Sequence, residues 1–456
     1  MAAARAAAGT PLTPAPRNLP VVTSSYWVET LGCPKNEVDS DKLVGTFHAD
    51  GMVPAASAAE ADLVVVNTCA FIDAAREESI GTVLDLAEQR RDGARLVVTG
   101  CMAERYGDEL AAALPEVDAV VGFSGQAALA AVTAPELVAT PVGAPTRLQR
   151  SAPALDLLNL PRPRSVRPWA YVKVAEGCDK ACGFCAIPSF RGPQRSRTIE
   201  SVLAEVSELD VQEVVLVAQD LAAFGRDRTA AVPGERSISQ LVREISTVVP
   251  WVRLLYLYPS ELTDELIELI ATGPVPYFDL SLQHVSAPLV KRMRRWGDGD
   301  RFAERIRSIR SIRPDAAFRS NFIVGYPGET EDDHDQLLRF VEEAQLDWCG
   351  FFTYSVEAGT YAADLDGAVP TSLMHERLRE LAELQDRITG ERRDALVGDV
   401  VEVLVDEPGV ARSHREAPEI DGIIGVPASL AVGERHRVRI TAAAGPDLTA
   451  VPVDAT

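Results

Sequence analysis

The chain alternates between segments typical of β-strands and segments typical of α-helices, and this alternation constrains its fold most. Three runs rich in β-branched residues each end in a turn of small residues, at residues 22–32, 62–68 and 94–100. Helical patterns separate these runs, at residues 36–49 and 72–91. Strands that alternate with helices form parallel sheets. We therefore predict a doubly wound parallel sheet in the first part of this α/β chain.

A second alternation follows a proline-rich link over residues 140–168. The predicted strands of this part are residues 169–175, 211–218, 252–257, 277–283, 317–325 and 349–354. The predicted helices are residues 199–209, 238–249, 261–272, 287–312 and 331–345. Six strand–helix units predict a partial (β/α)6 barrel, in which the chemistry is expected at the carboxyl ends of the strands.

The last part of the chain has a different pattern. A Glu- and Arg-rich helix predicted over residues 375–397 leads into short alternating strands separated by Gly and Pro, which predict a small antiparallel β-barrel. The predicted organisation is therefore a disordered tail, a first α/β domain, a central barrel and a final β-barrel. Their predicted limits are residues 1–21, 22–139, 164–395 and 397–456.

The formal charge of the chain, −22, bears on its partners. Binding to a nucleic-acid backbone depends on Lys and Arg, so direct binding of tRNA is not expected, whereas a basic protein is a suitable partner. The last segment, residues 397–456, is acidic as well, with ten acidic and five basic side chains. Because no run of eighteen apolar residues and no signal peptide is present, we expect a cytoplasmic protein without membrane contact.

Three cysteines form a CxxxCxxC loop directly after the first strand of the predicted barrel. Cys178, Cys182 and Cys185 are close enough in sequence to bind three irons of a [4Fe–4S] cube and to leave the fourth iron open. A structural zinc site would need a fourth ligand, which the neighbouring sequence lacks, and a redox pair would leave Cys178 unexplained. We therefore favour a cluster that chelates a substrate at its open iron.

Three further cysteines, Cys33, Cys69 and Cys101, are spread over the first domain. Each alone could be a buried structural cysteine. However, all three follow a predicted strand by one turn, at spacings of 36 and 32 residues. Parallel strands bring their carboxyl ends to one edge of the sheet, so the three thiols should converge there. This predicts a second cluster with an open iron. Cys349 lies inside a predicted strand and is interpreted as a free core cysteine.

Several motifs identify the chain as similar to a known family. They are LGCPKNEVDSD at 31–41, NTCAFIDAAREESI at 67–80, GCMAERY at 100–106, AEGCDKACGFCAIPSFRGPQRSR at 175–197, FIVGYPGET at 322–330 and APEIDG at 417–422. Over nearly its whole length the chain resembles the methylthiotransferase family of radical S-adenosylmethionine (SAM) enzymes. Within that family it is similar to the members that modify an aspartate of small-subunit ribosomal protein twelve.

The resemblance implies two [4Fe–4S] clusters and SAM as cofactors. The implied ligands are Cys33, Cys69 and Cys101 for an auxiliary cluster, and Cys178, Cys182 and Cys185 for the SAM-binding cluster. The implied reaction adds a methylthio group to the β-carbon of the aspartate, with one SAM as methyl donor and another as radical source. The final barrel would be a TRAM domain, a target-binding module. The implied partners are the ribosomal protein or the small subunit, an electron donor and a sulfur source.

Other residues near predicted strand ends are weaker candidates. Gln219 and Asp220 could lie near SAM, and His284 is as readily structural as functional. The Gly325–Gly328 turn could admit the adenosyl group, or could be only a tight turn. No general acid or base is predicted. Three arginines that could meet a carboxylate, but that we expect to be solvated at the surface, are Arg191, Arg195 and Arg197.

Two alternatives to the ribosomal-protein activity stay open at this point. The first is a tRNA adenosine methylthiotransferase with the same chemistry, which a basic stripe reaching the active-site mouth would favour. The second belongs to another class: an iron–sulfur protein that binds the ribosome without catalysis. Cleavage of SAM would separate this second alternative from both enzymes.

Overall fold

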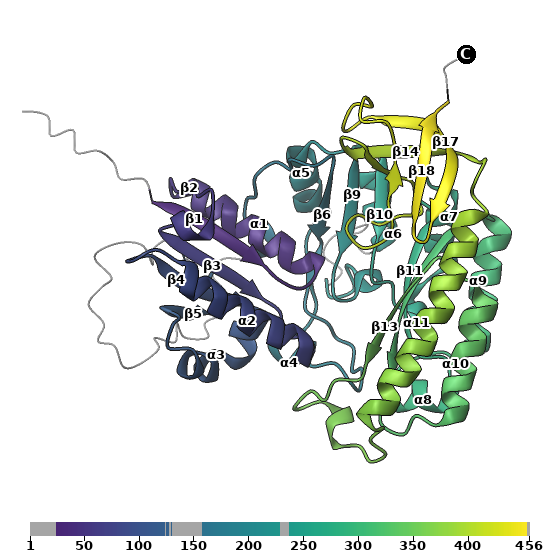
Figure 1. Cartoon of the computed structure of the whole chain (residues 1–456), viewed down its shortest axis with the longest axis horizontal. Coiled ribbons are helices and arrows are strands. Elements are labelled where there is room, and N and C mark those ends of the chain that lie inside the picture. Colours follow the sequence, from purple (N-terminus) through teal and green to yellow (C-terminus); the bar gives the residue numbers. More distant parts are fainter. Residues whose placement is uncertain (1–23, 124, 127–128, 130–156, 229–236, 454–456) are drawn as a thin grey trace, which may run out of the picture.

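The computed structural model describes residues 24–123, 125–126, 129, 157–228 and 237–453 (Figure 1). The predicted disordered tail and much of the proline-rich link lie outside these residues. Figure 1 shows an N-terminal α/β unit on one side, a larger central α/β unit beside it, and a small β-barrel packed on one end of the central unit. In the described part of the chain, no helix is long and apolar enough to cross a membrane.

The N-terminal unit is a five-stranded parallel sheet of order β2-β1-β3-β4-β5. Its strands are β1 (Ser25–Thr30), β2 (Val53–Pro54), β3 (Leu63–Thr68), β4 (Arg95–Gly100) and β5 (Ala119–Val121). Its helices are α1 (Pro34–Ala49), α2 (Asp73–Gln89) and α3 (Cys101–Ala113). The predicted doubly wound sheet is confirmed, although the short outer strands and α3 were not among the predicted elements.

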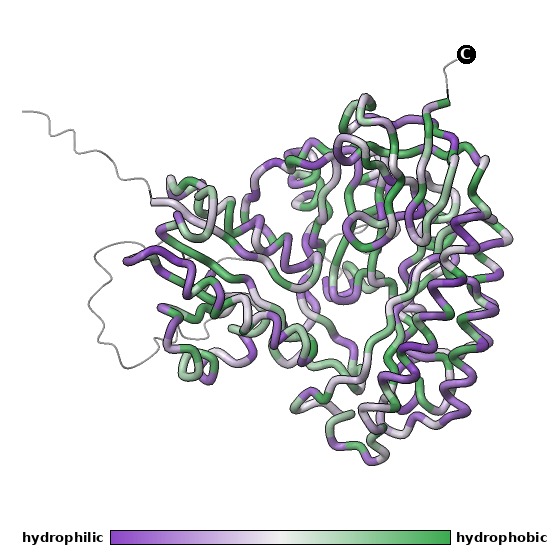
Figure 2. The backbone as a smooth tube through the Cα atoms, in the orientation of Figure 1, coloured by the Kyte–Doolittle hydropathy of each residue, from purple (hydrophilic) through white to green (hydrophobic). Residues whose placement is uncertain are grey.

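Successive residues of β3 face opposite sides of this sheet, as the pleat of a strand requires. Val64 and Val66 pack in the hydrophobic cluster that also contains residues of α2 and α3. Val65 packs in a second cluster, with Leu43 and Phe47 of α1. Apolar residues on both faces are expected for a parallel sheet that helices cover on both sides. Figure 2 shows the central strands as a hydrophobic band inside more hydrophilic helices.

The central unit contains six parallel strands in two sheets of three, with orders β10-β9-β6 and β11-β12-β13. A parallel bridge between Leu257 and Leu280 joins the two sheets into one open arc. The strands are β6 (Trp169–Lys173), β9 (Glu213–Val217), β10 (Trp251–Leu254), β11 (Tyr277–Gln283), β12 (Ala317–Val324) and β13 (Trp348–Thr353). The predicted partial barrel is therefore confirmed.

Helices cover the outer side of this arc (Figure 1). They are α5 (Ile199–Leu209), α6 (Ile238–Ile245), α7 (Asp264–Thr272), α8 (Ala287–Arg292), α9 (Gly299–Ile312), α10 (Glu331–Ala344) and α11 (Thr371–Asp394). The single helix predicted over residues 287–312 was wrong, because the chain breaks between α8 and α9. Gly297 has a positive φ of 102°, and the Asp298 side chain caps α9 by accepting a hydrogen bond from the Arg301 amide.

The C-terminal unit is a closed barrel of order β14-β15-β16-β18-β17. Its strands are β14 (Val400–Glu407), β15 (Val410–Arg412), β16 (Ile424–Gly425), β17 (Arg435–Ala444) and β18 (Asp447–Pro452). The pairs are antiparallel, as predicted, except for β16 and β18, which run parallel. A buried ion pair between Glu213 of β9 and Arg412 of β15 joins this barrel to the central unit.

Two candidate cysteine clusters

Three cysteines follow adjacent strands at one edge of the N-terminal sheet. Thr30 of β1 pairs with Asn67 of β3, and Asn67 pairs with Thr99 of β4, so the three strands end level. The cysteine after each strand end is Cys33 before α1, Cys69 after β3 and Cys101 at the start of α3. We call these residues the dispersed trio.

Contacts at Gly32 and Asn36 show how closely the loops that carry the dispersed trio approach one another. A side-chain carbon added to Gly32, whose φ is +99°, would lie 2.8 Å from Cβ and 3.0 Å from Sγ of Cys69. The side-chain nitrogen of Asn36 donates hydrogen bonds to the backbone carbonyl oxygens of Leu31, at 2.8 Å, and Thr68, at 3.1 Å. The Asn36 side-chain oxygen also lies 3.7 Å from Cys101 Sγ. Asn36 therefore holds all three cysteine loops together.

The electrostatic surroundings of the dispersed trio differ between its members. Burial, with a smaller contribution from the neighbouring Cys33 and Cys101, raises the pKa of Cys69 to about 12. Burial also raises the pKa of Cys101, against the opposing effect of Arg191. Burial opposes ionisation of Cys33 too, but Lys35 and Arg191 lower its pKa below the ordinary value. Since metals bind the thiolate, these cations favour the form that a cluster would need.

The second group, which we call the loop trio, contains Cys178, Cys182 and Cys185, between β7 (Ala175–Glu176) and α4 (Ile187–Arg191). All three side chains are partly exposed. The Cys178 amide donates to the Gly192 carbonyl oxygen at 3.1 Å, and the Cys185 amide donates to the Cys182 carbonyl oxygen at 3.2 Å. Arg295 donates to Cys182 Sγ at 3.2 Å. These contacts fix a compact loop with a cation beside one sulfur.

The donors of each trio are three thiols, a set that suits an iron–sulfur cube. Within the described ranges, no group of three Cys, His, Asp or Glu side chains is placed to hold one metal ion together. In a cube, each thiolate binds a different iron, so the three sulfurs surround a larger body. The donor set, three thiols without a fourth protein ligand, also suits a cube with one open iron.

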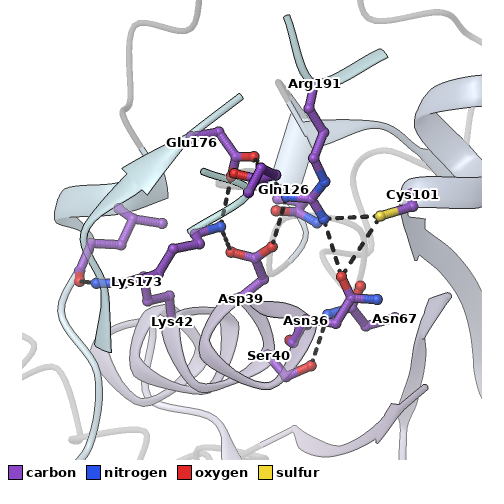
Figure 3. A network of polar contacts seen from close by, with 12 residues as sticks. Asn36, Asp39, Ser40, Lys42, Asn67, Cys101, Gln126, Lys173, Glu176 and Arg191 are labelled. Carbon is purple, nitrogen blue, oxygen red and sulfur yellow. Dashed lines mark hydrogen bonds and ion pairs between the residues drawn. The ribbon is translucent and has the colours of Figure 1, made fainter. Parts of the chain in front are cut away.

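Arg191, the last residue of α4, connects the two trios (Figure 3). Its guanidinium donates to Cys101 Sγ at 2.9 Å and to the Asn36 side-chain oxygen at 3.1 Å. The same guanidinium donates to Glu176 at 2.8 Å, two residues before Cys178. Figure 3 shows this arginine reaching between the strand that carries Glu176 and the helix that begins with Cys101.

The expectation that the three arginines are solvated was wrong for two of them. Arg191 is buried in the network just described, and Arg197 is buried against Glu205, at 2.6 Å. Arg195 is exposed, as expected. Both buried arginines are paired with carboxylates, which offset the cost of removing their charge from water.

The other candidates have clear partners in the structure. Gln219 donates to Glu176 at 2.9 Å, and Asp220 lies 3.5 Å from the Lys180 ammonium. His284 is fully buried, accepts a hydrogen bond from the Ser286 amide, and has a pKa lowered by burial to about 3. A side chain at Gly325 would lie 2.2 Å from Met374, so packing against α11 explains that glycine. Cys349 is partly buried and packs against the central core.

Two charged residues near the dispersed trio were not predicted from the sequence. Lys35 lies near Cys33, and Glu357 pairs with Arg105, which donates to the Ala70 carbonyl oxygen next to Cys69. Lys35, beside Cys33, lies 3.4 Å from the centre of the Tyr256 ring, which belongs to the central unit. Glu357, just after β13, pairs with Arg76 at 2.8 Å and with Arg105 at 2.6 Å. Lys35 lies inside the GCPKN segment, two residues after Cys33, and this position was a signal that could have been used. Glu357 carries no comparable signal.

Comparisons with known proteins agree with this architecture. Residues 25–122 match the uncharacterized protein family UPF0004, residues 172–341 match the radical SAM superfamily, and residues 397–453 match the TRAM domain. A solved radical SAM methyltransferase, TsrM from Kitasatospora setae, shares the fold with a TM-score of 0.52. That alignment has 14% identity and covers 90% of this chain and 84% of that chain. The fold and the cysteine loop thus define a radical SAM enzyme.

Curated relatives specify the family. The chain is 42% identical over 407 residues to the ribosomal protein uS12 methylthiotransferase RimO of Moorella thermoacetica, with 88% of this chain and 92% of the relative covered. It is 40% identical to the protein of the same name from Sorangium cellulosum, with 93% and 90% covered. The chain belongs to the RimO family of methylthiotransferases, and this membership implies SAM and [4Fe–4S] chemistry.

Proposed function

We propose that this chain transfers a methylthio group to the β-carbon of an aspartate in the small-subunit ribosomal protein uS12. The names of its curated relatives support this substrate. The observation that carries the proposal is the contact of Arg191 with Cys101, at 2.9 Å. Arg191 follows Cys185 by six residues, so this contact joins the segment that carries the loop trio to the dispersed trio of the other domain, which supports a shared junction. A reaction that combines sulfur transfer with radical chemistry requires such a junction.

We further propose that the dispersed trio and the loop trio each hold a [4Fe–4S] cluster. When bound, the cluster at the loop trio supplies the electron that cleaves SAM, and the auxiliary cluster supplies the site from which sulfur is transferred. The protein's part is to hold the two sites in a fixed relation. Asn36 and Arg191 do this on the side of the dispersed trio, and Arg295 orients the Cys182 sulfur.

Phenylalanine side chains flank the loop trio, whose cysteines remain partly exposed. Phe190 of α4 packs against the hydrophobic cluster of the N-terminal sheet, and Phe184 packs against a cluster that contains Tyr326 and Met293. Shielding of a cluster affects its reduction potential, and it protects reactive species from side reactions. These contacts make the loop trio part of both domains.

The tRNA alternative depends on a basic surface near the cysteines. Arg435, Arg437 and Arg439 form an exposed row on β17. However, β17 lies on the side of the molecule away from the N-terminal unit (Figure 1), so this row does not reach the cysteines. The net charge of −22 suits a basic ribosomal protein in the cytoplasm better than tRNA.

The experiment that tests the proposal is anaerobic reconstitution with iron and sulfide, followed by incubation with SAM, dithionite and purified uS12. We expect release of 5′-deoxyadenosine and a uS12 mass increase equal to replacement of one hydrogen by a methylthio group. Substitution of either trio by Ala should remove half of the bound iron and abolish transfer. Transfer to tRNA but not to uS12 would favour the tRNA alternative, and no SAM cleavage would favour the non-catalytic alternative.

A further inference from the structure

Lys35 is a buried cation without a carboxylate partner. It is the second residue of α1, two residues after Cys33, and only 8% of its surface is exposed. Its ammonium faces the ring of Tyr256, which follows β10 in the central unit, at 3.4 Å from the ring centre. Among the residues that the structure describes, no carboxylate forms an ion pair with Lys35.

The other buried cations where these two units meet are all paired with carboxylates. These pairs are Lys42 with Glu205 at 2.9 Å, Lys173 with Glu176 at 2.7 Å, Arg191 with Glu176 at 2.8 Å and Arg105 with Glu357 at 2.6 Å. A contact with an aromatic ring stabilises a buried ammonium only in part. Removing an ion from water costs more than such a contact contributes, so the ring alone does not compensate Lys35.

The position of Tyr256 is fixed by the protein. Its φ of +63° is unusual for a residue with a side chain, and its amide donates to Asp279 at 2.9 Å. A backbone held in this region costs energy, and such positions cluster at binding sites. Tyr256 therefore holds Lys35 in place from the opposite domain without neutralising its charge.

Lys35 lies two residues from the one member of the dispersed trio that is partly exposed. Cys33 is partly exposed, whereas Cys69 and Cys101 are buried. A substrate that reaches this trio must therefore approach beside Cys33, where Lys35 is its neighbour. The anion beside Lys35 is the Cys33 thiolate, which a cluster would bind, so Lys35 lacks only a carboxylate partner of its own. The proposed target side chain is a carboxylate.

We propose that Lys35 binds the side-chain carboxylate of the target aspartate. The carboxylate carbon is bonded directly to the β-carbon, so fixing the carboxylate also fixes the carbon that receives the methylthio group. Lys35 then distinguishes aspartate from asparagine, because the amide is neutral. This inference rests on the proposed function and deepens it by naming a residue that determines specificity.

The test measures binding rather than turnover. The full chain with reconstituted clusters is titrated with uS12 that carries either the native aspartate or asparagine at the target position. We expect the parent to prefer the aspartate form by about 10- to 100-fold, the range for a hydrogen bond to a charged group. Lys35→Met should lose this preference by weakening binding of the aspartate form alone. Lys35→Arg should keep most of it, because the charge remains.

Controls separate this role from a structural one. Lys291→Met, at an exposed position in α8, should change neither binding constant. Iron content and cluster absorption should be the same in Lys35→Met as in the parent. The inference is overturned if Lys35→Met keeps the preference, if it weakens both forms equally, or if the parent modifies uS12 but binds both forms equally. A parent that does not modify uS12 overturns the proposed function itself, and the inference falls with it.

Discussion

Glu205 of α5 is shared by three cations where the N-terminal and central units meet. It lies 2.9 Å from Lys42, 2.6 Å from Arg197 and 3.5 Å from Arg162. Arg162 also pairs with Asp41. The side chains of Glu205 and its three cations are less than 10% exposed. This group therefore holds three cations against two carboxylates, Glu205 and Asp41. Removing a negative charge should therefore lower the free energy of unfolding far more than removing a positive charge.

Glu205→Gln should be strongly destabilising, whereas Lys42→Met should cost little. The first change leaves Lys42 and Arg197 beside a neutral side chain and Arg162 paired with Asp41 alone, and breaking a buried pair in this way costs about 3–5 kcal/mol. The second change removes the surplus cation. Burial, together with Arg197 and Arg162, lowers the pKa of Lys42 from 10.5 to about 8, although Glu205 opposes this shift. Its removal loses hydrogen bonds to the Leu160 carbonyl oxygen and to Glu205, but Glu205 keeps Arg197 and Arg162, so we expect a cost of about 1–2 kcal/mol.

The same group predicts a pH dependence. The folded pKa of Lys42 lies below that of the unfolded chain, so the unfolded chain binds more protons between about pH 8 and 10.5. Stability from this group therefore rises as the pH increases through that window. The difference in stability between the parent and Lys42→Met should rise in the same window, because the variant lacks the titrating group.

Amide hydrogen exchange in α1 and α5 gives the free energy of opening of this junction. The variants are compared with Glu208→Gln, an exposed change in the same helix that should alter this free energy by less than about 0.5 kcal/mol. Equal losses for Lys42→Met and Glu205→Gln would refute the reasoning, since they would show that Lys42 is an essential partner rather than a surplus charge.

Three other features give measurable expectations. Gly45→Ala places a Cβ 2.2 Å from the Pro161 backbone oxygen, so urea unfolding should show a free energy of unfolding lower by about 1–3 kcal/mol. In Gly390→Ala the added Cβ meets nothing within 4 Å, so the free energy of unfolding should rise by up to about 1 kcal/mol. Glu357→Gln should lower the opening free energy of α2 by about 2–3 kcal/mol in hydrogen exchange, and exposed Glu391→Gln by less than about 0.5 kcal/mol. His284 has a pKa of about 3 in the folded protein and stays neutral there, whereas in the unfolded chain it is protonated below pH 6.5. The free energy of unfolding should therefore fall as the pH drops from 6.5. In urea unfolding, His284→Gln should show a smaller fall of the midpoint over the same pH range.

The elements that local sequence patterns determine could be predicted. The β-branched runs before Cys33, Cys69 and Cys101 end in small residues, and these patterns located β1, β3 and β4. Helix α3 was harder to predict from the sequence. Within it, Tyr106 departs from helical geometry, with a φ of −123°, and Gly107 follows it. These residues weaken the local helical signal, and the helix depends on packing against the sheet.

The contacts of charged residues could not be predicted in the same way. Arg191 looked like a surface residue because its partners are Glu176 and, 155 residues away in sequence, Asn36. Lys35 was likewise not recognised as buried, since Tyr256 reaches it from the other domain. The sequence indicates which side chains carry charge, but only the docking of two domains determines which of these charges leave water.

The two trios differ in when a nascent chain could first accept metal. Cys178, Cys182 and Cys185 are neighbours along one short loop and come together without any distant contact. Cys33, Cys69 and Cys101 meet only after β1, β3 and β4 have paired in register. Closing loops of this length makes such an arrangement slow and cooperative. Any cluster on these three strands must therefore be loaded onto a folded domain, so iron delivery follows sheet formation during maturation.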